Sequence, residues 1–181
     1  NLKVIKLKNI LLEETADTDV KMFATDLAGE VEDELENEMP TQEGRLNESI
    51  IGIIGYVLLS NTVANMLSKF VKKQAGKLNL DKTEAAAQKI ADWSHRNEVA
   101  FKAPIKRVVS IFTKNPKYQK IISDILYAII ILGMAGQAGA GVVNYVKKAA
   151  WFKSGFYALK TYVKGAEVHH IIKDVISDIG I

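Results

Sequence analysis

The chain has 181 residues, which is long enough for one domain with a buried core, and its 48% hydrophobic and 25% charged residues are typical of globular proteins. It contains no cysteine, which excludes a disulfide framework, thiolate catalysis and a cysteine-ligated metal site. The net charge of +3 is unevenly distributed, because residues 1–40 hold four lysines and eleven acids, whereas residues 41–181 hold twenty basic and ten acidic residues. An acidic head therefore precedes a basic body, and the two either attract one another or face different partners.

The first 40 residues are predicted to form an acidic amphipathic N-terminal segment. Residues 3–12 mix lysines with aliphatic residues, and residues 15–19 are rich in the Thr and Asp that cap helices. The helix that follows has an apolar stripe at spacings of three and four residues: Val20, Phe23, Leu27, Val31 and Leu35. The sequence PTQEG at residues 40–44 then indicates a linker. We expect three regions, namely the segment at 1–40, a linker at 41–48 and a basic helical-bundle domain at 49–181.

An uncharged run at residues 49–68 opens the basic domain. Small and polar residues, among them Ser60, Asn61 and Asn65, recur along it every three or four positions. This polar stripe favours a bundle helix over a membrane-spanning helix, which would have to place two asparagines in the membrane. Residues 69–120 follow with thirteen basic and four acidic residues. Within them, residues 81–101 predict an amphipathic helix whose register is Ala86, Ile90, Trp93, Asn97 and Phe101.

Two prolines mark expected helix starts. Pro104 is expected to begin a new helix over residues 105–112. Asn115 followed by Pro116 is a capping residue with proline at the first helical position, so it predicts another helix start. This last helix leads directly into the central stretch at residues 125–146.

The central stretch runs for 22 residues without a charge. A helix that is apolar on all sides is buried either by protein or by lipid, and this one is long enough to cross a bilayer. The sequence leaves both interpretations open. Small residues in its second half suit either close helix packing or a tight turn: Gly133, Ala135, Gly136, Gly139, Ala140 and Gly141.

Residues 142–165 are apolar and aromatic, with lysines and no acid. They suit an amphipathic bundle helix, a segment at a membrane interface, or contact with nucleic acid phosphates. The interface or phosphate contacts would be Lys147, Lys148, Trp151, Phe152, Lys153, Tyr157, Lys160, Tyr162 and Lys164. A last apolar stripe at 168–179 predicts one more helix. No alternation of period two indicates strands, so the predicted fold is all-α: a helical bundle with an acidic N-terminal helical segment and a central hydrophobic helix hairpin.

The sequence contains no recognisable catalytic or metal-binding set. His170 and Asp174 lie one helical turn apart, but with His169 they supply too few ligands for a closed zinc site. His95 lacks the carboxylate and nucleophile context of a hydrolase triad. The glycines at 133–141 lack the GK[ST] ending and the preceding strand of a phosphate-binding loop. We therefore expect a non-enzymatic protein with no cofactor, no metal and no small-molecule substrate.

The N-terminal sequence KLKNILLEE at residues 6–14 resembles the capsid-targeting peptides of virion proteins in large contractile-tailed bacteriophages, especially marine ones. In that group a prohead protease cuts after Leu-x-Glu or Ile-x-Glu, a pattern that ends here at Glu13, Glu14 and Glu48. The resemblance covers residues 1–14.

The resemblance implies a small helical protein of the virion, internal to the head or associated with the particle. Its partners would be other virion proteins and copies of itself in a homo-oligomer, packed through apolar helices, with DNA or membrane as further contacts. The alternative interpretation is a pore-forming, holin-like or DNA-entry protein that inserts residues 125–146 into the host inner membrane.

Overall fold

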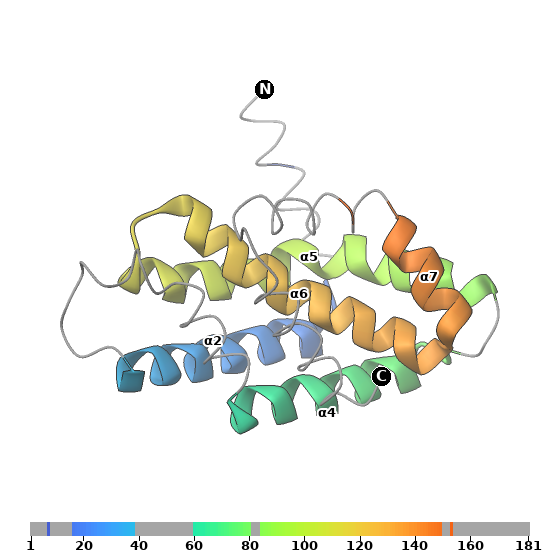
Figure 1. The fold of residues 1–181 in the computed structure, drawn as a ribbon, viewed down its shortest axis with the longest axis horizontal. Helices are drawn as coiled ribbons and strands as arrows, with labels where there is room; N and C mark the ends of the chain where they lie inside the picture. The colour runs from blue at the N-terminus through green and yellow to red at the C-terminus, as the bar shows by residue number, and fades with distance from the viewer. Residues whose placement is uncertain (1–6, 8–15, 39–59, 81–83, 150–152, 154–181) are drawn as a thin grey trace.

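The computed structural model of the chain describes residues 7, 16–38, 60–80, 84–149 and 153. This part of the chain is all-α, as Figure 1 shows, and the prediction of an all-α bundle is confirmed. Its helices are α2 (Thr18–Glu38), α4 (Asn61–Lys77), α5 (Glu84–Phe112), α6 (Pro116–Ala138) and α7 (Ala140–Lys148).

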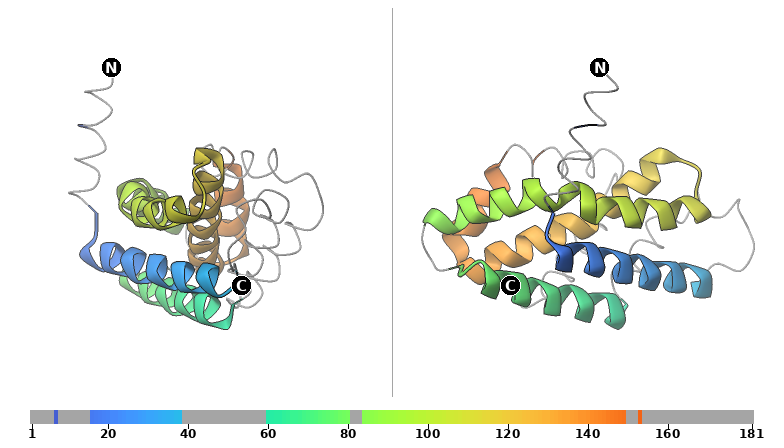
Figure 2. Two further views of the ribbon diagram at one scale, coloured as in Figure 1. Left: turned by 90° about the vertical axis from the view of Figure 1, so that its left-hand side faces the viewer. Right: turned by 180° about the vertical axis from the view of Figure 1, so that it is seen from behind.

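The four longer helices form a bundle in which α2 and α6 are diagonally opposite. Both α2 and α6 pack against α4 and against α5, whereas α4 and α5 lie across the other diagonal and, among the described residues, meet only through side chains, such as Gln74 and Trp93. The two views of Figure 2 show α2 and α4 side by side along one edge. The short α7 turns back from the end of α6 and packs on α6 and α5.

One hydrophobic core unites all five helices. It includes Leu27 of α2, Leu67 of α4, Ile90 of α5, Ile125 of α6 and Val146 of α7, each at most 1% exposed. The helix predicted within the acidic N-terminal segment therefore contributes to the same core as the helices of the basic domain.

The central apolar helix, α6, is covered by its neighbours. Ile129, Ile130 and Ile131 point in three directions around the helix and are all buried. Among the described helices, α6 is the one long and apolar enough to cross a membrane, over Gln119–Ala138, and 83% of that stretch is buried inside the protein. In this structure, other helices supply the apolar surroundings that such a helix requires.

The helix α5 passes through Pro104 and continues to Phe112, so the prediction that Pro104 begins a new helix is wrong. A proline inside a helix removes one hydrogen bond and costs about 3 kcal/mol. A buried stripe that stays in register across the proline outweighs this cost. Its members recur every four residues: Trp93, Asn97, Phe101, Ile105 and Val109.

The helix α4 begins inside the uncharged run. Ser60 caps it with an extended backbone (φ −60°, ψ 130°), and its hydroxyl accepts a hydrogen bond from the N–H of Val63. The polar stripe faces outward, since Asn61 and Asn65 are exposed while Leu67 is fully buried. Residues 49–59 of this run and the linker at 41–48 lie outside the described residues.

Two glycines near the end of α6 have different roles. Gly139 has a φ of 118°, a conformation that favours glycine, and it separates α6 from α7. Gly133 lies where α6 approaches α4, and a Cβ atom there would be 2.9 Å from both methyl groups of Val71. The first glycine thus permits a break between helices, and the second permits close contact between them.

Candidate functional site

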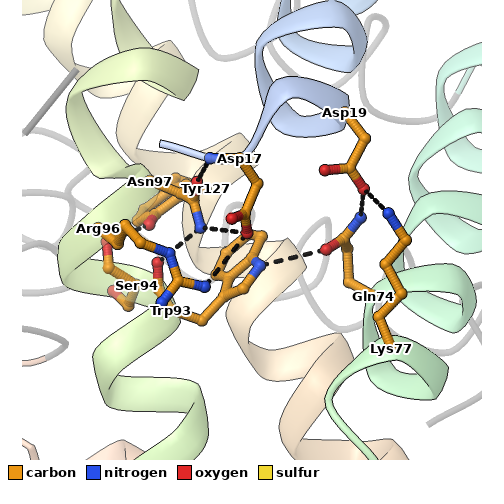
Figure 3. Close-up of polar contacts among 9 residues, drawn as sticks. All are labelled: Asp17, Asp19, Gln74, Lys77, Trp93, Ser94, Arg96, Asn97 and Tyr127. Atoms are coloured by element: carbon orange, nitrogen blue, oxygen red, sulfur yellow. Dashed lines mark hydrogen bonds and ion pairs between the residues drawn. The ribbon is translucent and has the colours of Figure 1, made fainter. Parts of the chain in front are cut away.

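A polar network joins the start of α2 to α4 and α5, and Tyr127 of α6 hydrogen-bonds to the same part of α5, as Figure 3 shows. We call it the α2 network. Its members are Asp17, Asp19, Gln74, Lys77, Trp93, Ser94, Arg96, Asn97 and Tyr127.

Asp17 holds the start of α2 on α5. Its backbone N–H donates to Asn97 Oδ1 at 2.9 Å, and its carboxylate accepts from Asn97 Nδ2 at 3.3 Å and from Arg96 Nη2 at 3.2 Å. Asn97 is fully buried, and its Nδ2 also donates to the Trp93 carbonyl at 3.0 Å. Both ends of the Asn97 amide are therefore paired, which removes most of the cost of burying it.

Asp19 holds the same turn of α2 on α4. Its Oδ2 accepts hydrogen bonds from Gln74 Nε2 and from Lys77 Nζ, the latter at 2.7 Å. The buried Gln74 in turn accepts a hydrogen bond from the indole N–H of Trp93 at 3.2 Å. Burial raises the pKa of Asp19, but the hydrogen bonds from Lys77 and Gln74 outweigh it and hold the pKa below its ordinary value. An ionised carboxylate of lowered pKa suits a structural contact better than general-base catalysis.

Aromatic rings pack beside the α2 network. Phe23 of α2 stacks on Phe70 of α4 with ring centroids 3.8 Å apart, and Trp93 stacks on Tyr127 of α6 at 6.1 Å. The Tyr127 hydroxyl donates a hydrogen bond to the Ser94 carbonyl, and burial raises its pKa. This tyrosine therefore stays protonated and joins α6 to α5.

A buried ion pair forms a second polar connection between α5 and α6. Lys102 Nζ lies 2.7 Å from Asp124 Oδ1 and 2.8 Å from Glu98 Oε1, and the Asp124 side chain is only 7% exposed. Burial lowers the pKa of Lys102, but the contacts with Asp124 and Glu98 outweigh it and raise the pKa above its ordinary value. The protonated Lys102 amine is not a nucleophile, so its contact with Asp124 is structural and joins α5 to α6.

The remaining small residues of the central stretch lie in different surroundings. Ala135 is buried on α6 and Gly136 is half-buried. Ala140 and Gly141 are exposed on α7, and a Cβ atom at Gly141 would meet no atom within 4 Å. The close-packing interpretation does not hold for these two among the described residues, because the chain changes direction at Gly139.

Three of the residues predicted as interface or phosphate contacts lie in the described part of the chain. Lys147, Lys148 and Lys153 are all exposed, and the first two lie in the last turn of α7. The others lie outside the described residues, so their role stays a prediction: Trp151, Phe152, Tyr157, Lys160, Tyr162 and Lys164. The same holds for the processing residues Glu13, Glu14 and Glu48.

The histidines do not form part of a metal cluster in the described ranges. No three His, Cys, Asp or Glu side chains come together there in a way that would hold an ion. His95 is exposed on α5. The pair His169 and His170 lies outside the described residues, as does Asp174.

The α2 network was not predicted from the sequence, although part of its signal is visible there. Gln74 and Asn97 are polar residues at core positions, with buried apolar residues three or four positions away on the same helix. Such residues are expected to hydrogen-bond across the core. The role of Asp17 and Asp19 had no such signal, because their partners lie 80 and 58 positions further along the chain.

The polar groups of the α2 network and of the Lys102–Asp124 pair thus connect neighbouring helices. Donors from α5 hold Asp17, donors from α4 hold Asp19, and a carboxylate of α6 holds Lys102. Comparison with known protein families, with curated protein sequences and with solved structures finds no match to this chain.

Proposed function

We propose that this chain is a non-enzymatic structural protein of a bacteriophage particle that packs with copies of itself or with neighbouring virion proteins. The α2 network carries the non-enzymatic part of the proposal, because its carboxylates are engaged in helix-to-helix contacts. The phage part rests on the N-terminal sequence and its similarity to capsid-targeting peptides. A bundle of this kind supplies shape and surface charge to an assembly, which requires no reactive group.

The position of α2 favours processing after Glu13 or Glu14 over processing after Glu48. The helix begins at Thr18, so either of the first two cuts leaves it complete. A cut after Glu48 would remove α2 and expose the apolar side chains of α4 and α5 that it covers. We therefore expect a mature chain that begins at residue 14 or 15.

Mass spectrometry of purified phage particles tests both the location and the processing. We expect peptides from α2 through α7 in the particle, with an N-terminal peptide that starts at residue 14 or 15. A double variant, Glu13→Ala with Glu14→Ala, should retain the targeting sequence, whereas the control Glu48→Ala should be processed as the wild type is. A protein found in lysing cells and never in washed particles would overturn the proposal.

A second candidate function is membrane insertion by residues 125–146. It is favoured by one observation, the length and apolar character of α6. Because neighbouring helices bury α6, insertion would require the bundle to open. This candidate predicts partition into detergent and loss of insertion in an Ile130→Lys variant. A chain that stays in the aqueous phase and leaves lipid vesicles intact would count against it.

A further inference from the structure

The outer face of α4 is strongly basic. The helix contains Lys69, Lys72, Lys73 and Lys77 and no acidic residue. Lys77 is paired with Asp19, whereas the other three lysines are exposed and make no ion pair within the described part of the chain. Three uncompensated positive charges therefore lie on one helix.

These lysines share one face of α4. At 3.6 residues per turn, Lys69, Lys72 and Lys73 fall within an arc of about 100°. This arc lies opposite the buried Val63 and Leu67 and includes the exposed Asn65. The face extends from Asn61 at the start of the helix over about 18 Å, at a rise of about 1.5 Å per residue. Because α4 lies along an edge of the bundle (Figure 2), its exposed lysine and asparagine side chains follow that edge.

The acidic helix α2 does not neutralise this row, although it lies beside α4. The contacts of Asp19 with Lys77 and of Phe23 with Phe70 show that the two helices are antiparallel. The first turn of α2 is therefore next to the basic end of α4. The acids at residues 30–38 lie toward the opposite end, beside the uncharged start of α4.

We propose that the outer face of α4 binds the phosphate backbone of nucleic acid without reading its sequence. Lysine side chains neutralise phosphates, and Asn side chains hydrogen-bond to phosphate oxygens, which fixes position without sequence information. The inference rests on the proposed function only for the identity of the polyanion, which inside a particle is the packaged genome. The binding itself is a property of the isolated bundle.

Salt-dependent binding to a fluorescently labelled DNA duplex tests the proposal with the purified full chain. The affinity of the wild type should fall steeply with salt. For a triple variant, Lys69→Gln, Lys72→Gln and Lys73→Gln, we expect a shallower slope of log affinity against log salt concentration. The slope should decrease in magnitude by about 0.9 for each phosphate contact removed. Over a roughly fourfold increase in salt concentration, the fold-loss of affinity should be about 40 times smaller for the variant than for the wild type. Lys and Gln have similar helix propensities, so the variant should fold, which circular dichroism verifies.

A matched control removes the same charge elsewhere. The triple variant Arg107→Gln, Lys114→Gln and Lys120→Gln changes only exposed basic side chains outside α4. It should keep most of the wild-type slope. Equal losses in both triple variants would overturn the proposal, because net charge and not the α4 face would then control binding.

Other outcomes would also overturn it. One is a wild-type chain that does not bind the duplex at low salt. A second is retention on anionic lipid vesicles without duplex binding, which would assign the face to a membrane. A third is self-association lost in the α4 variant, again without duplex binding, which would assign it to a second copy. In each case, detection of the chain in purified particles would leave the proposed function standing.

Discussion

The helices α2 and α6 occupy opposite corners of the bundle and differ in how much apolar packing and polar contacts each contribute to holding them there. The helix α6 is apolar around its circumference, and 83% of its apolar stretch is buried. The helix α2 carries eight acidic residues against one lysine, Lys21, a net charge of −7. It presents a narrow apolar stripe to the core, and polar contacts of Asp17 and Asp19 fix its first turn. Apolar packing therefore contributes most to the position of α6, with Asp124 and Tyr127 adding polar contacts to α5. The position of α2 depends on a narrower apolar stripe together with directed polar contacts at its start.

The charge distribution of α2 makes its two ends unequal. Its last turn contains acids and no basic residue, although the C-terminal end of a helix carries partial negative charge. Like charges at Glu30 and Glu34, and at Glu32 and Glu36, are one turn apart and repel. The first turn, by contrast, contacts Arg96 and Lys77. We expect α2 to be held firmly at its start and weakly at its end.

The largest expected effect is a truncation in α6. Ile130→Ala shortens a side chain that is 0% exposed, so the free energy of unfolding should fall by about 3 kcal/mol. Urea denaturation measures this change. The control Ile111→Ala changes a side chain that is 68% exposed and should cost less than about 0.5 kcal/mol. Similar effects of the two changes would mean that α6 is not the core helix.

A smaller effect is expected where α6 contacts α4. Gly133→Ala places a Cβ atom 2.9 Å from the Val71 methyl groups and should cost about 1–3 kcal/mol through overpacking. Adding Val71→Ala makes room, so the double variant should lose less stability than the sum of the two single variants. The control Gly141→Ala, in open space on α7, should stabilise by about 0.5 kcal/mol through helix propensity. Strict additivity of the first pair would contradict the close approach.

For α2, the expected effect is smaller again and depends on pH. Asp19→Asn removes the charge that contacts Lys77 and Gln74 and should cost about 1 kcal/mol near neutral pH. Because the pKa of Asp19 is below its ordinary value of 3.8, its contribution is present above that pH and is lost as the pH falls through the lowered pKa. The wild type and the variant should therefore converge in stability at strongly acidic pH. The control Asp26→Asn changes an exposed side chain of the same helix and should alter the free energy of unfolding near neutral pH by less than about 0.5 kcal/mol.

The smallest expected effect is a gain at the other end of α2. Glu36→Lys places a positive charge in the last turn of the helix and should stabilise by about 0.5 kcal/mol at low salt. Amide hydrogen exchange should slow in the last turns of α2 and remain unchanged in α6. A loss of stability would show that Glu36 contacts a cation and that the end of α2 is not weakly held.

The sequence was informative where a helix has one periodic apolar stripe. The stripe from Val20 to Leu35 predicted α2, and Asn115 with Pro116 marked the start of α6. The interpretation of Pro104 failed because the helix-breaking tendency of proline is a local rule. The continuous stripe from Trp93 to Val109 stabilises one helix through contacts that only the folded protein supplies.

The sequence could not distinguish burial of the central stretch by protein from burial by lipid, because both provide the apolar surroundings that an apolar helix needs. In the structure, neighbouring helices bury Ile130 completely. The α2 network could not be predicted from the sequence either. It depends on which helices become neighbours, and an Asp in a capping cluster gives no sign of a lysine 58 positions away.

The long sequence separation between α2 and its partners has a consequence during protein synthesis. The helix leaves the ribosome before the residues that cover its apolar stripe exist, since Asp17 contacts Asn97, 80 positions later. Contacts so distant in sequence form slowly, and apolar surfaces left uncovered in the meantime favour aggregation. The acids that weaken the end of the finished helix give the nascent segment a strong negative charge, and this charge keeps the segment soluble until α5 has been translated.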